Sequence, residues 1–380
     1  MACQLLTSDS RPHALYVSTK LSAVKVLIVK RYSSGSMLED PAMFTLRKSA
    51  PGLLERLLNG FSQPPVELVY TSQPNWPFGS ILSREFNANR PLRLSVLDSS
   101  FNPPTRAHLA LANARRPHAE QLKDDRPGLQ EGNDYDAKLL LLSVKNADKK
   151  LKPGDATYLQ RLEMMALLTK HMSPASTAVT AGGAPSFAAT ANVAIAITDE
   201  PTFVGKSEVL LAFLRQKLLS LPASPTAIEL TFLIGQDTLE RLFSSRYYSS
   251  DTVMTKALHK FFTPAPEGDN SRLVSATRAL MPGTSSDEHT TANSKASHLV
   301  QHYLSLGRLT IIDIGEEEST YSSSAVRNAI ALEGCAPKDP EARQTWRNFV
   351  TTEVADYIIQ EKLFTNKSMT TNTGFLASQS

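Results

Sequence analysis

Cysteine is almost missing from this 380-residue chain, which contains only Cys3 and Cys335. Two cysteines cannot build a disulfide framework, and by themselves they cannot form a four-ligand zinc site. The chain therefore has to fold without either kind of cross-link. We expect a protein of a reducing compartment, the cytoplasm, with the nucleus as a further location.

Long apolar runs and a large charge of one sign are also lacking. Apolar runs such as Leu139–Leu142 have the length of a strand, whereas a membrane span needs about 20 residues. Forty Lys and Arg residues stand against 37 Asp and Glu residues, which gives a net charge of +3. A nucleic-acid-binding protein usually carries a concentrated basic face. We expect a soluble protein that binds neither membranes nor nucleic acids.

The amino-terminal segment has a composition of its own. Its first 36 residues hold five basic residues, one acidic residue (Asp9) and several serines. This composition loosely resembles a mitochondrial transit peptide. The alternative is an ordinary extension, in which residues 21–32 form a short strand. Residues 1–90 are assigned to an N-terminal extension of unknown role, and both interpretations stay open.

From about Pro91 onward, short apolar runs alternate with helical stretches, which indicates repeated βαβ units. Near-continuous apolar strands are typical of parallel sheets covered on both faces. We predict an α/β fold with a mostly parallel sheet and helices on both faces. The predicted strands are Leu92–Leu97, Lys138–Val144, Asn192–Thr198, Glu229–Ile234, Arg272–Ala276 and Leu309–Ile314. The predicted helices are Thr105–Arg116, Asp155–His171, Lys206–Leu219, Asp237–Phe243, Ser294–Leu306 and Ser323–Leu332.

Three segments rich in polar or small residues interrupt this rhythm, at residues 115–136, 174–191 and 281–296. Ser, Thr, Gly and Ala bury too little apolar area to offset the entropy of ordering them. We interpret the three segments as insertions in one domain that runs from residue 91 to residue 365. Residues 366–380, rich in Ser, Thr and Asn, are expected to form a disordered tail.

The most informative segment is LSVLDSSFNPPTRAHLAL, residues 94–111. A predicted strand ends at Asp98, a tight turn follows, and a helix begins near Thr105. Free N–H groups at a helix start, at the carboxyl end of a parallel strand, favour phosphate. His108 lies one turn into that helix and would point into the same space. Taken alone, such a histidine is more often a packed structural residue.

A second segment, TYSSSAVRNAI, covers residues 320–330 and follows another predicted strand. Three serines, Ser322 to Ser324, are candidate helix caps. Arg327 lies one turn inside the helix, where a guanidinium can bind phosphate oxygens. Two motifs of this kind, each at a strand-to-helix junction, predict a nucleotide site that the fold assembles from distant parts of the chain.

The two motifs together resemble those of nicotinamide mononucleotide adenylyltransferases, in the nucleotidyltransferase superfamily with the (H/T)xGH motif. SSFNPPTRAHL is similar to the family's GSFNPxTxxHL, and TYSSSAVR is similar to its ISSTxIR. Thr105 and His108 take the ends of the (H/T)xGH motif, whereas Ser99 replaces a family glycine. The resemblance covers about Leu92 to Phe364 and looks closest to the fungal promoter-of-filamentation branch. It implies a Rossmann-like nucleotidyltransferase fold.

The resemblance also implies an activity, the transfer of AMP from ATP to nicotinamide mononucleotide to give NAD and pyrophosphate. His108 and Arg327 would be catalytic, and Mg²⁺ would come with ATP rather than from a protein metal site. The family's nucleotide-binding segments are matched by SVKNADKKLK, FLIGQDTLERLF and SATRAL, and more weakly by TDEPTFVGKS. The residues that would bind ATP or NAD are Ser99, Ser100, Lys150, Phe203, Gly235, Asp237, Arg278, Ser323 and Ser324.

Two other readings remain open. A sister enzyme, such as a phosphopantetheine adenylyltransferase or a cytidylyltransferase, would share both phosphate motifs. Alternatively, Ser99 in place of glycine and the long insertions would suit a nucleotide-binding regulatory or scaffold protein with weak turnover. A turnover assay with a panel of acceptors discriminates among all three. The preference between nicotinamide and nicotinic acid mononucleotide and the oligomeric state are also left open by the sequence.

Overall fold

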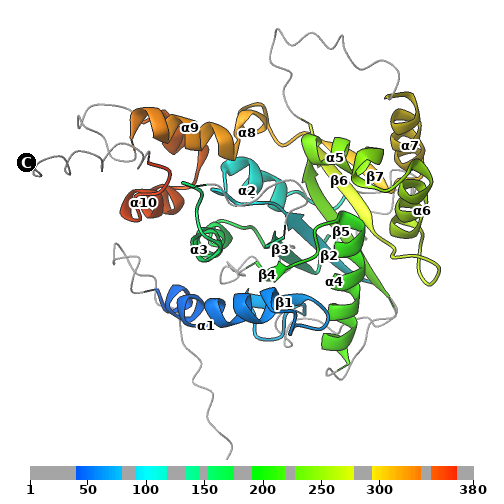
Figure 1. Ribbon diagram of the computed structural model, residues 1–380, viewed down its shortest axis with the longest axis horizontal. Helices are drawn as coiled ribbons and strands as arrows, with labels where there is room; N and C mark the ends of the chain where they lie inside the picture. The colour runs from blue at the N-terminus through cyan, green and yellow to red at the C-terminus, as the bar shows by residue number, and fades with distance from the viewer. Residues whose placement is uncertain are drawn as a thin grey trace, which may run out of the picture. The chain divides into compact units, whose positions relative to one another are not determined.

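The computed structural model describes residues 40–78, 91–117, 134–145, 153–174, 191–219, 227–277, 293–334 and 344–365. In these residues seven strands form one sheet, in the order β1-β4-β3-β2-β5-β6-β7 (Figure 1). All neighbouring strands are parallel except β1, which pairs antiparallel with β4. The strands are β1 (Val66–Thr71), β2 (Leu92–Asp98), β3 (Ala137–Ser143), β4 (Val193–Thr198), β5 (Ile228–Gly235), β6 (Arg272–Ala276) and β7 (Leu309–Ile312).

Helices follow the strands and cover both faces of the sheet (Figure 1). They are α1 (Pro41–Leu58), α2 (Arg106–Ala112), α3 (Tyr158–Thr169), α4 (Phe203–Leu218), α5 (Gln236–Leu242), α6 (Asp251–Phe262), α7 (Asn293–Ser305), α8 (Glu316–Thr320), α9 (Ser323–Glu333) and α10 (Thr352–Gln360). None of the helices in the described ranges is both long and apolar enough to cross a membrane.

The alternation of side chains along the strands divides the core into two layers. In β3, Leu140 and Leu142 belong to the core layer that contains α1, α3 and α10, whereas Leu139 and Leu141 belong to the layer that contains α4, α6 and α7. Successive residues of a strand point to opposite faces, so a continuous apolar run serves both layers. The parallel sheet with helices on both faces, predicted from such runs, is confirmed.

The six predicted strands are all present, and each begins and ends within two residues of its prediction. The predicted helices are present too, with three notable shifts. Helix α3 begins at Tyr158, three residues late. Helix α2 ends at Ala112, four residues early, and α4 begins at Phe203, three residues early, because the Thr202 hydroxyl caps it by accepting from the Gly205 N–H at 3.1 Å. The prediction of a domain that begins only at residue 91 needs a correction.

The described residues before position 91, residues 40–78, belong to the same compact unit as the later strands and helices. Strand β1 adds an antiparallel edge to β4, with Val66 opposite Thr198. Helix α1 buries Leu46 and Ala50 in the core layer that also holds α3. The pairing partners are more than 120 residues apart in sequence, so no local pattern specifies this contact.

Several sequence predictions fall outside the described residues. They are the short strand at 21–32, the tail at 366–380 and the central parts of the three insertions, at residues 118–133, 175–190 and 281–292. The last four residues of the third insertion belong to the first turn of α7 rather than to a connecting segment.

Candidate active site

A cavity of about 590 Å³ opens at the carboxyl ends of the central strands. Strand β2 is the point where the strand order reverses, because β3 and β4 lie on one side of it and β5 and β6 on the other. Open α/β sheets bind their ligands at such a switch point. Both sequence motifs contribute to the cavity wall, with Ser99, Ser100 and His108 from one and Ser322, Ser323, Ser324 and Arg327 from the other.

The turn between β2 and α2 forms the centre of the wall. Its N–H at Ser99 donates to the Leu141 carbonyl at 3.3 Å, which extends the strand pairing into the turn. The left-handed backbone falls on the buried Phe101, at φ 46°, and not on Ser99. The replacement of the family glycine by Ser99 therefore costs no left-handed strain.

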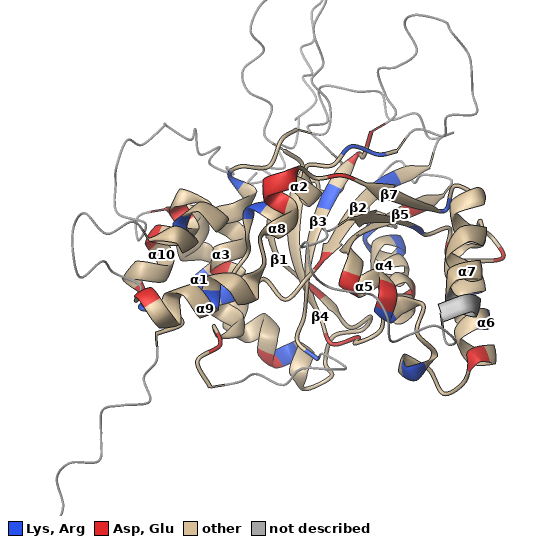
Figure 2. Cartoon of the chain, turned by 90° about the horizontal axis from the view of Figure 1, so that it is seen from above, with Lys and Arg blue, Asp and Glu red and all other residues tan. Residues whose placement is uncertain are grey.

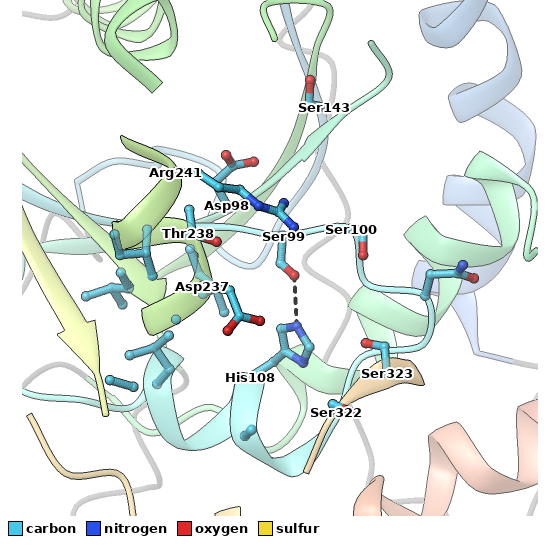
Figure 3. A pocket seen from close by; sticks show the side chains of 18 of the residues that line it. Asp98, Ser99, Ser100, His108, Ser143, Asp237, Thr238, Arg241, Ser322 and Ser323 are labelled. Carbon is cyan, nitrogen blue, oxygen red and sulfur yellow. Dashed lines mark hydrogen bonds between the residues drawn. The ribbon is translucent and has the colours of Figure 1, made fainter. Parts of the chain in front are cut away.

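His108 is held at both ring nitrogens. The Thr105 backbone N–H donates to Nδ1 at 3.0 Å, which makes Nδ1 an acceptor and leaves the ring proton on Nε2. Nε2 lies 2.8 Å from the Ser99 hydroxyl, at the surface of the cavity (Figure 3). Burial lowers the pKa of His108 to about 4, so the ring is neutral at neutral pH. His108 thus has one N–H donor, at Nε2, beside the cavity that it lines.

The second motif meets the first at the start of α9. Ser322 caps the helix by accepting from the Ala325 N–H at 3.1 Å. The Ser323 hydroxyl donates to the Pro103 carbonyl at 2.7 Å, and Arg327 Nη1 donates to the Asn102 carbonyl at 2.6 Å. Residues more than 200 positions apart therefore share one surface, as the paired motifs indicate.

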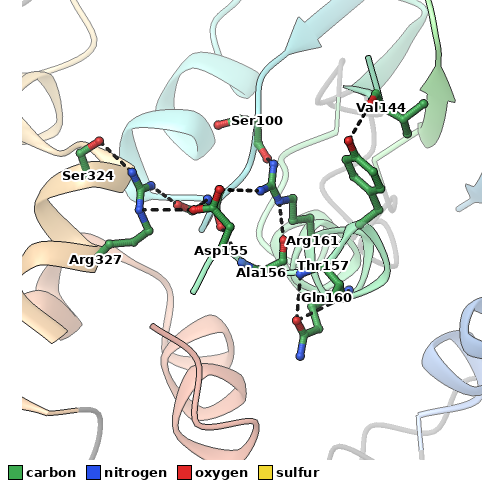
Figure 4. A network of polar contacts seen from close by, with 11 residues as sticks. Ser100, Val144, Asp155, Ala156, Thr157, Gln160, Arg161, Ser324 and Arg327 are labelled. Atoms are coloured by element: carbon green, nitrogen blue, oxygen red, sulfur yellow. Dashed lines mark hydrogen bonds and ion pairs between the residues drawn. The ribbon is translucent and has the colours of Figure 1, made fainter. Parts of the chain in front are cut away.

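Asp155 stands at the centre of the polar network that joins these parts (Figure 4). Its Oδ1 accepts from Asn102 Nδ2 at 2.7 Å and lies 4.0 Å from Arg327 Nε. Its Oδ2 lies 3.7 Å from Arg161 Nη2, and Arg161 Nη1 donates to the Ser100 carbonyl at 3.3 Å. One carboxylate thus positions two guanidinium groups. The sequence does not predict this role, because Asp155 lies within a polar stretch and its pairing depends on the fold.

The wall formed by α4 contains Phe203, which lies three residues before the predicted start of this helix at Lys206. It is the first residue of α4 and lines the cavity, but its ring packs edge-on against Phe232 at 6.0 Å. The Lys206 ammonium lies 4.9 Å from the centre of the same ring. Lys206 Nζ also donates to Asp98 Oδ2 at 2.5 Å, and both side chains are only 6% exposed.

Another part of the wall comes from β5 and α5. Gly235 precedes α5 and Asp237 lies in its first turn, and both line the cavity as the sequence predicts. Two neighbouring tyrosines, Tyr247 and Tyr248, line it as well, and the sequence analysis did not single them out. The Tyr248 hydroxyl donates to the Leu242 carbonyl at 3.1 Å, and burial raises its pKa to about 12. The signal in the sequence that could have found these tyrosines is their position as a pair shortly after the helix that starts behind Gly235.

Two predicted ligands, Lys150 and Arg278, lie outside the described residues. The cations that do line the cavity are Lys145, Arg161, Lys206, Arg241 and Arg327. They come from five different elements or turns and surround the neutral His108. Over the rest of the described chain, basic and acidic residues are interspersed on helices and loops (Figure 2). Four acidic residues, Asp98, Asp155, Asp237 and Glu318, line the same cavity, so its wall combines cations with carboxylates.

No family model matches the chain. It is 30% identical over 168 residues to a Schizosaccharomyces pombe protein named "Putative nicotinamide mononucleotide adenylyltransferase", and the match spans 44% of this chain and 49% of that protein. The chain thus matches about half the length of this curated relative.

Two solved structures are also similar to the chain. Both are Plasmodium falciparum nicotinic acid mononucleotide adenylyltransferase, one complexed with NaAD and one with APC. Each is 14% identical and covers 72% of this chain, with TM-scores of 0.39 and 0.37 and coverage of 97% and 96% of the solved chains.

The two motifs, which resemble those of nucleotidyltransferases with the (H/T)xGH motif, meet at the switch point of the sheet. The chain is also similar to one curated protein named as an adenylyltransferase, over about half of that protein's length.

Proposed function

We propose that this protein transfers the AMP moiety of ATP to nicotinamide mononucleotide and so makes NAD and pyrophosphate. The observation that carries the proposal is the shared surface of the two motifs, where His108 and Arg327 face one cavity from segments more than 200 residues apart. The name of the curated relative supports the same acceptor.

The reaction needs no covalent intermediate. A phosphate oxygen of the mononucleotide forms a bond to the α-phosphorus of ATP, and the bond from that phosphorus to the α,β-bridging oxygen breaks in line with it. Pyrophosphate leaves with the bonding electrons. Catalysis then consists of positioning and charge stabilisation, as in other phosphoryl transfers.

Each residue has a part that follows from its geometry. His108 Nε2–H donates to an α-phosphate oxygen, where charge develops in the transition state, once that oxygen takes the place of the Ser99 hydroxyl. Arg327 and the serines at the start of α9 bind the departing pyrophosphate. Gly235 allows close approach of the nucleoside on the α5 wall, and Asp237 accepts from ribose hydroxyls.

Mg²⁺ fits the proposed chemistry as an ion carried by ATP. The described residues contain no group of three or more His, Cys, Asp or Glu able to hold a metal. Asp98 is paired with Lys206, and Asp155 lies between two arginines. Mg²⁺ is commonly bound through phosphates and water with one or two carboxylates at most. When bound, it would offset phosphate charge.

The test is a turnover assay with purified protein, Mg-ATP and four acceptors. These are nicotinamide mononucleotide, nicotinic acid mononucleotide, phosphopantetheine and, with CTP, choline phosphate. We expect NAD and pyrophosphate in equal amounts from the first. Adenylylation of phosphopantetheine or cytidylylation of choline phosphate without any dinucleotide would contradict the proposal. Binding of ATP with no turnover on any acceptor would favour a regulatory protein.

A further inference from the structure

A buried ion pair in the cavity wall has no part in the phosphate chemistry. Lys206 Nζ and Asp98 Oδ2 are 2.5 Å apart, and each side chain is 6% exposed. By contrast, the pair Lys260–Glu208 also involves α4, yet its side chains are 47% and 65% exposed. Taking two charges out of water is costly, so a buried pair is weak evidence for a purely stabilising role. Because both residues line the cavity, the pair is also in a position to contact a ligand bound there.

The position of the pair identifies the part of the ligand it would meet. Asp98 ends β2 at the switch point, and Lys206 lies one turn into α4, beside the ring of Phe203. A dinucleotide bound across a switch point sends one half toward each side of the sheet. The α5 side holds Gly235 and Asp237, which the proposed function assigns to ATP. The α4 wall, with the ion pair, is left for the acceptor.

The pair offers a donor and an acceptor side by side. After its bond to Asp98, the ammonium of Lys206 has further N–H donors, and the carboxylate of Asp98 has further lone pairs. A primary carboxamide has the complementary pattern, because its carbonyl oxygen accepts and its NH₂ group donates. A carboxylate has only acceptors, and it would place a second negative charge beside Asp98.

We propose that the Asp98–Lys206 pair selects a carboxamide over a carboxylate on the pyridine ring of the acceptor. This inference rests on the proposed function and deepens it, since it assigns the choice between the two mononucleotides to one pair of residues. Asp98 is the discriminating member. Lys206 alone would attract the acid, and its neutralisation by Asp98 removes that attraction.

The first experiment uses the unmodified protein and three acceptors, namely nicotinamide mononucleotide, nicotinic acid mononucleotide and 3-acetylpyridine mononucleotide. The third keeps the carbonyl oxygen but lacks the NH₂ donor. We expect kcat/KM to fall at least about tenfold from the amide to each of the other two, because a site built to pair an N–H rejects analogues without it. Equal kcat/KM for all three would overturn the inference.

The second experiment changes the pair. Asp98→Asn keeps the shape of the side chain and removes its negative charge. It should raise kcat/KM for nicotinic acid mononucleotide, so that the ratio of kcat/KM for the amide to kcat/KM for the acid falls at least about tenfold. Glu208→Gln is the matched control, because it removes one charge from the exposed pair on the same helix. The control should leave the ratio unchanged. A ratio that Asp98→Asn changes less than about twofold would contradict the assignment.

The outcomes separate this inference from the proposed function. If no pyridine mononucleotide is adenylylated by the unmodified protein, the proposed function fails, and the inference falls with it. If both mononucleotides are adenylylated with equal efficiency, the proposed function stands and the inference is wrong. Should Asp98→Asn not fold, the comparison on the unmodified protein can still overturn the inference, because an acid that reacts as well as the amide would contradict it.

Discussion

His108 carries the part of the proposed chemistry that depends most on one atom, its Nε2–H. His108→Ala removes this donor, and turnover should fall about 100-fold, or about 2.7 kcal/mol, by analogy with the loss of one oxyanion-hole donor. Binding of the mononucleotide should change much less, because the donor acts on ATP. Steady-state kinetics and equilibrium binding check the two effects separately.

Stability should respond only slightly to the same change. Nδ1 of His108 accepts from the N-cap Thr105 N–H, so its loss should cost about 1 kcal/mol, the usual value of a cap interaction. His259→Ala, which removes an exposed imidazole on α6, is the control for both measurements. A variant that unfolds several degrees earlier but keeps full activity per folded molecule would remove His108 from the active site.

The lowered pKa of His108 gives a second prediction, for stability against pH. The unfolded chain binds a proton at this residue below its ordinary pKa of 6.5, whereas the folded chain binds it only near 4. The stabilisation is therefore complete above pH 6.5 and is lost as pH falls from 6.5 toward 4. The unfolding temperatures of the unmodified protein and of His108→Asn, measured across this pH range, should converge toward low pH. Parallel curves would show that the histidine is not protected from protonation.

Asp155 allows a third prediction that separates positioning from structure. Asp155→Asn keeps an acceptor for Asn102 but removes the charge that holds Arg161 and Arg327. We expect kcat to fall about tenfold, because small displacements of positioning groups are costly. KM for ATP should fall as well, since a negative charge leaves the phosphate end. Asp356→Asn, on an exposed position of α10, is the control. A higher KM for ATP with unchanged kcat would contradict the argument.

Among the residues of the site, the sequence predicts those whose positions are determined by local geometry and motif spacing. His108 and Arg327 face the cavity because each follows a strand-to-helix junction. The Asp98–Lys206 pair could not be predicted, since it depends on how α4 packs across the end of β2. The same holds for Asp155, whose three partners come from separate segments.

Substitutions in helix α1 test whether the domain begins before residue 91. Leu46 lies in its buried face at 1% exposure, whereas Phe44 on the same helix is 66% exposed. Leu46→Ala should lower the free energy of unfolding by about 2–5 kcal/mol, the usual range for a buried leucine, and Phe44→Ala should lower it by about 0.5 kcal/mol or less. Denaturant unfolding measures both. Equal effects would mean that α1 does not pack as described.

Strands and helices agree best with their sequence predictions where the local sequence pattern is strongest. Strands with near-continuous apolar residues were found to within two residues. Helix α1 was missed although it has clear end signals, an Asp40 cap, Pro41 in the first turn and Gly60 at φ 74° after its end. Its role could not be predicted, because only the tertiary contact with the α3 layer shows that it belongs to the domain.

For the molecule as a whole, the place where the compact unit begins decides which shortened chains can fold. A chain that begins at Met37 keeps every described element, so we expect its thermal unfolding and turnover to match those of the full chain. A chain that begins at Pro91 loses α1 and β1. It would expose one edge of β4 and the core face that α1 covers, and such an open edge promotes aggregation. Size-exclusion chromatography, thermal unfolding and turnover on the two chains test this difference. The opposite outcome is a chain from Pro91 that stays monodisperse and is as stable and as active as the longer one. That result would mean that α1 and β1 add nothing to the fold and that the domain boundary predicted at residue 91 is correct.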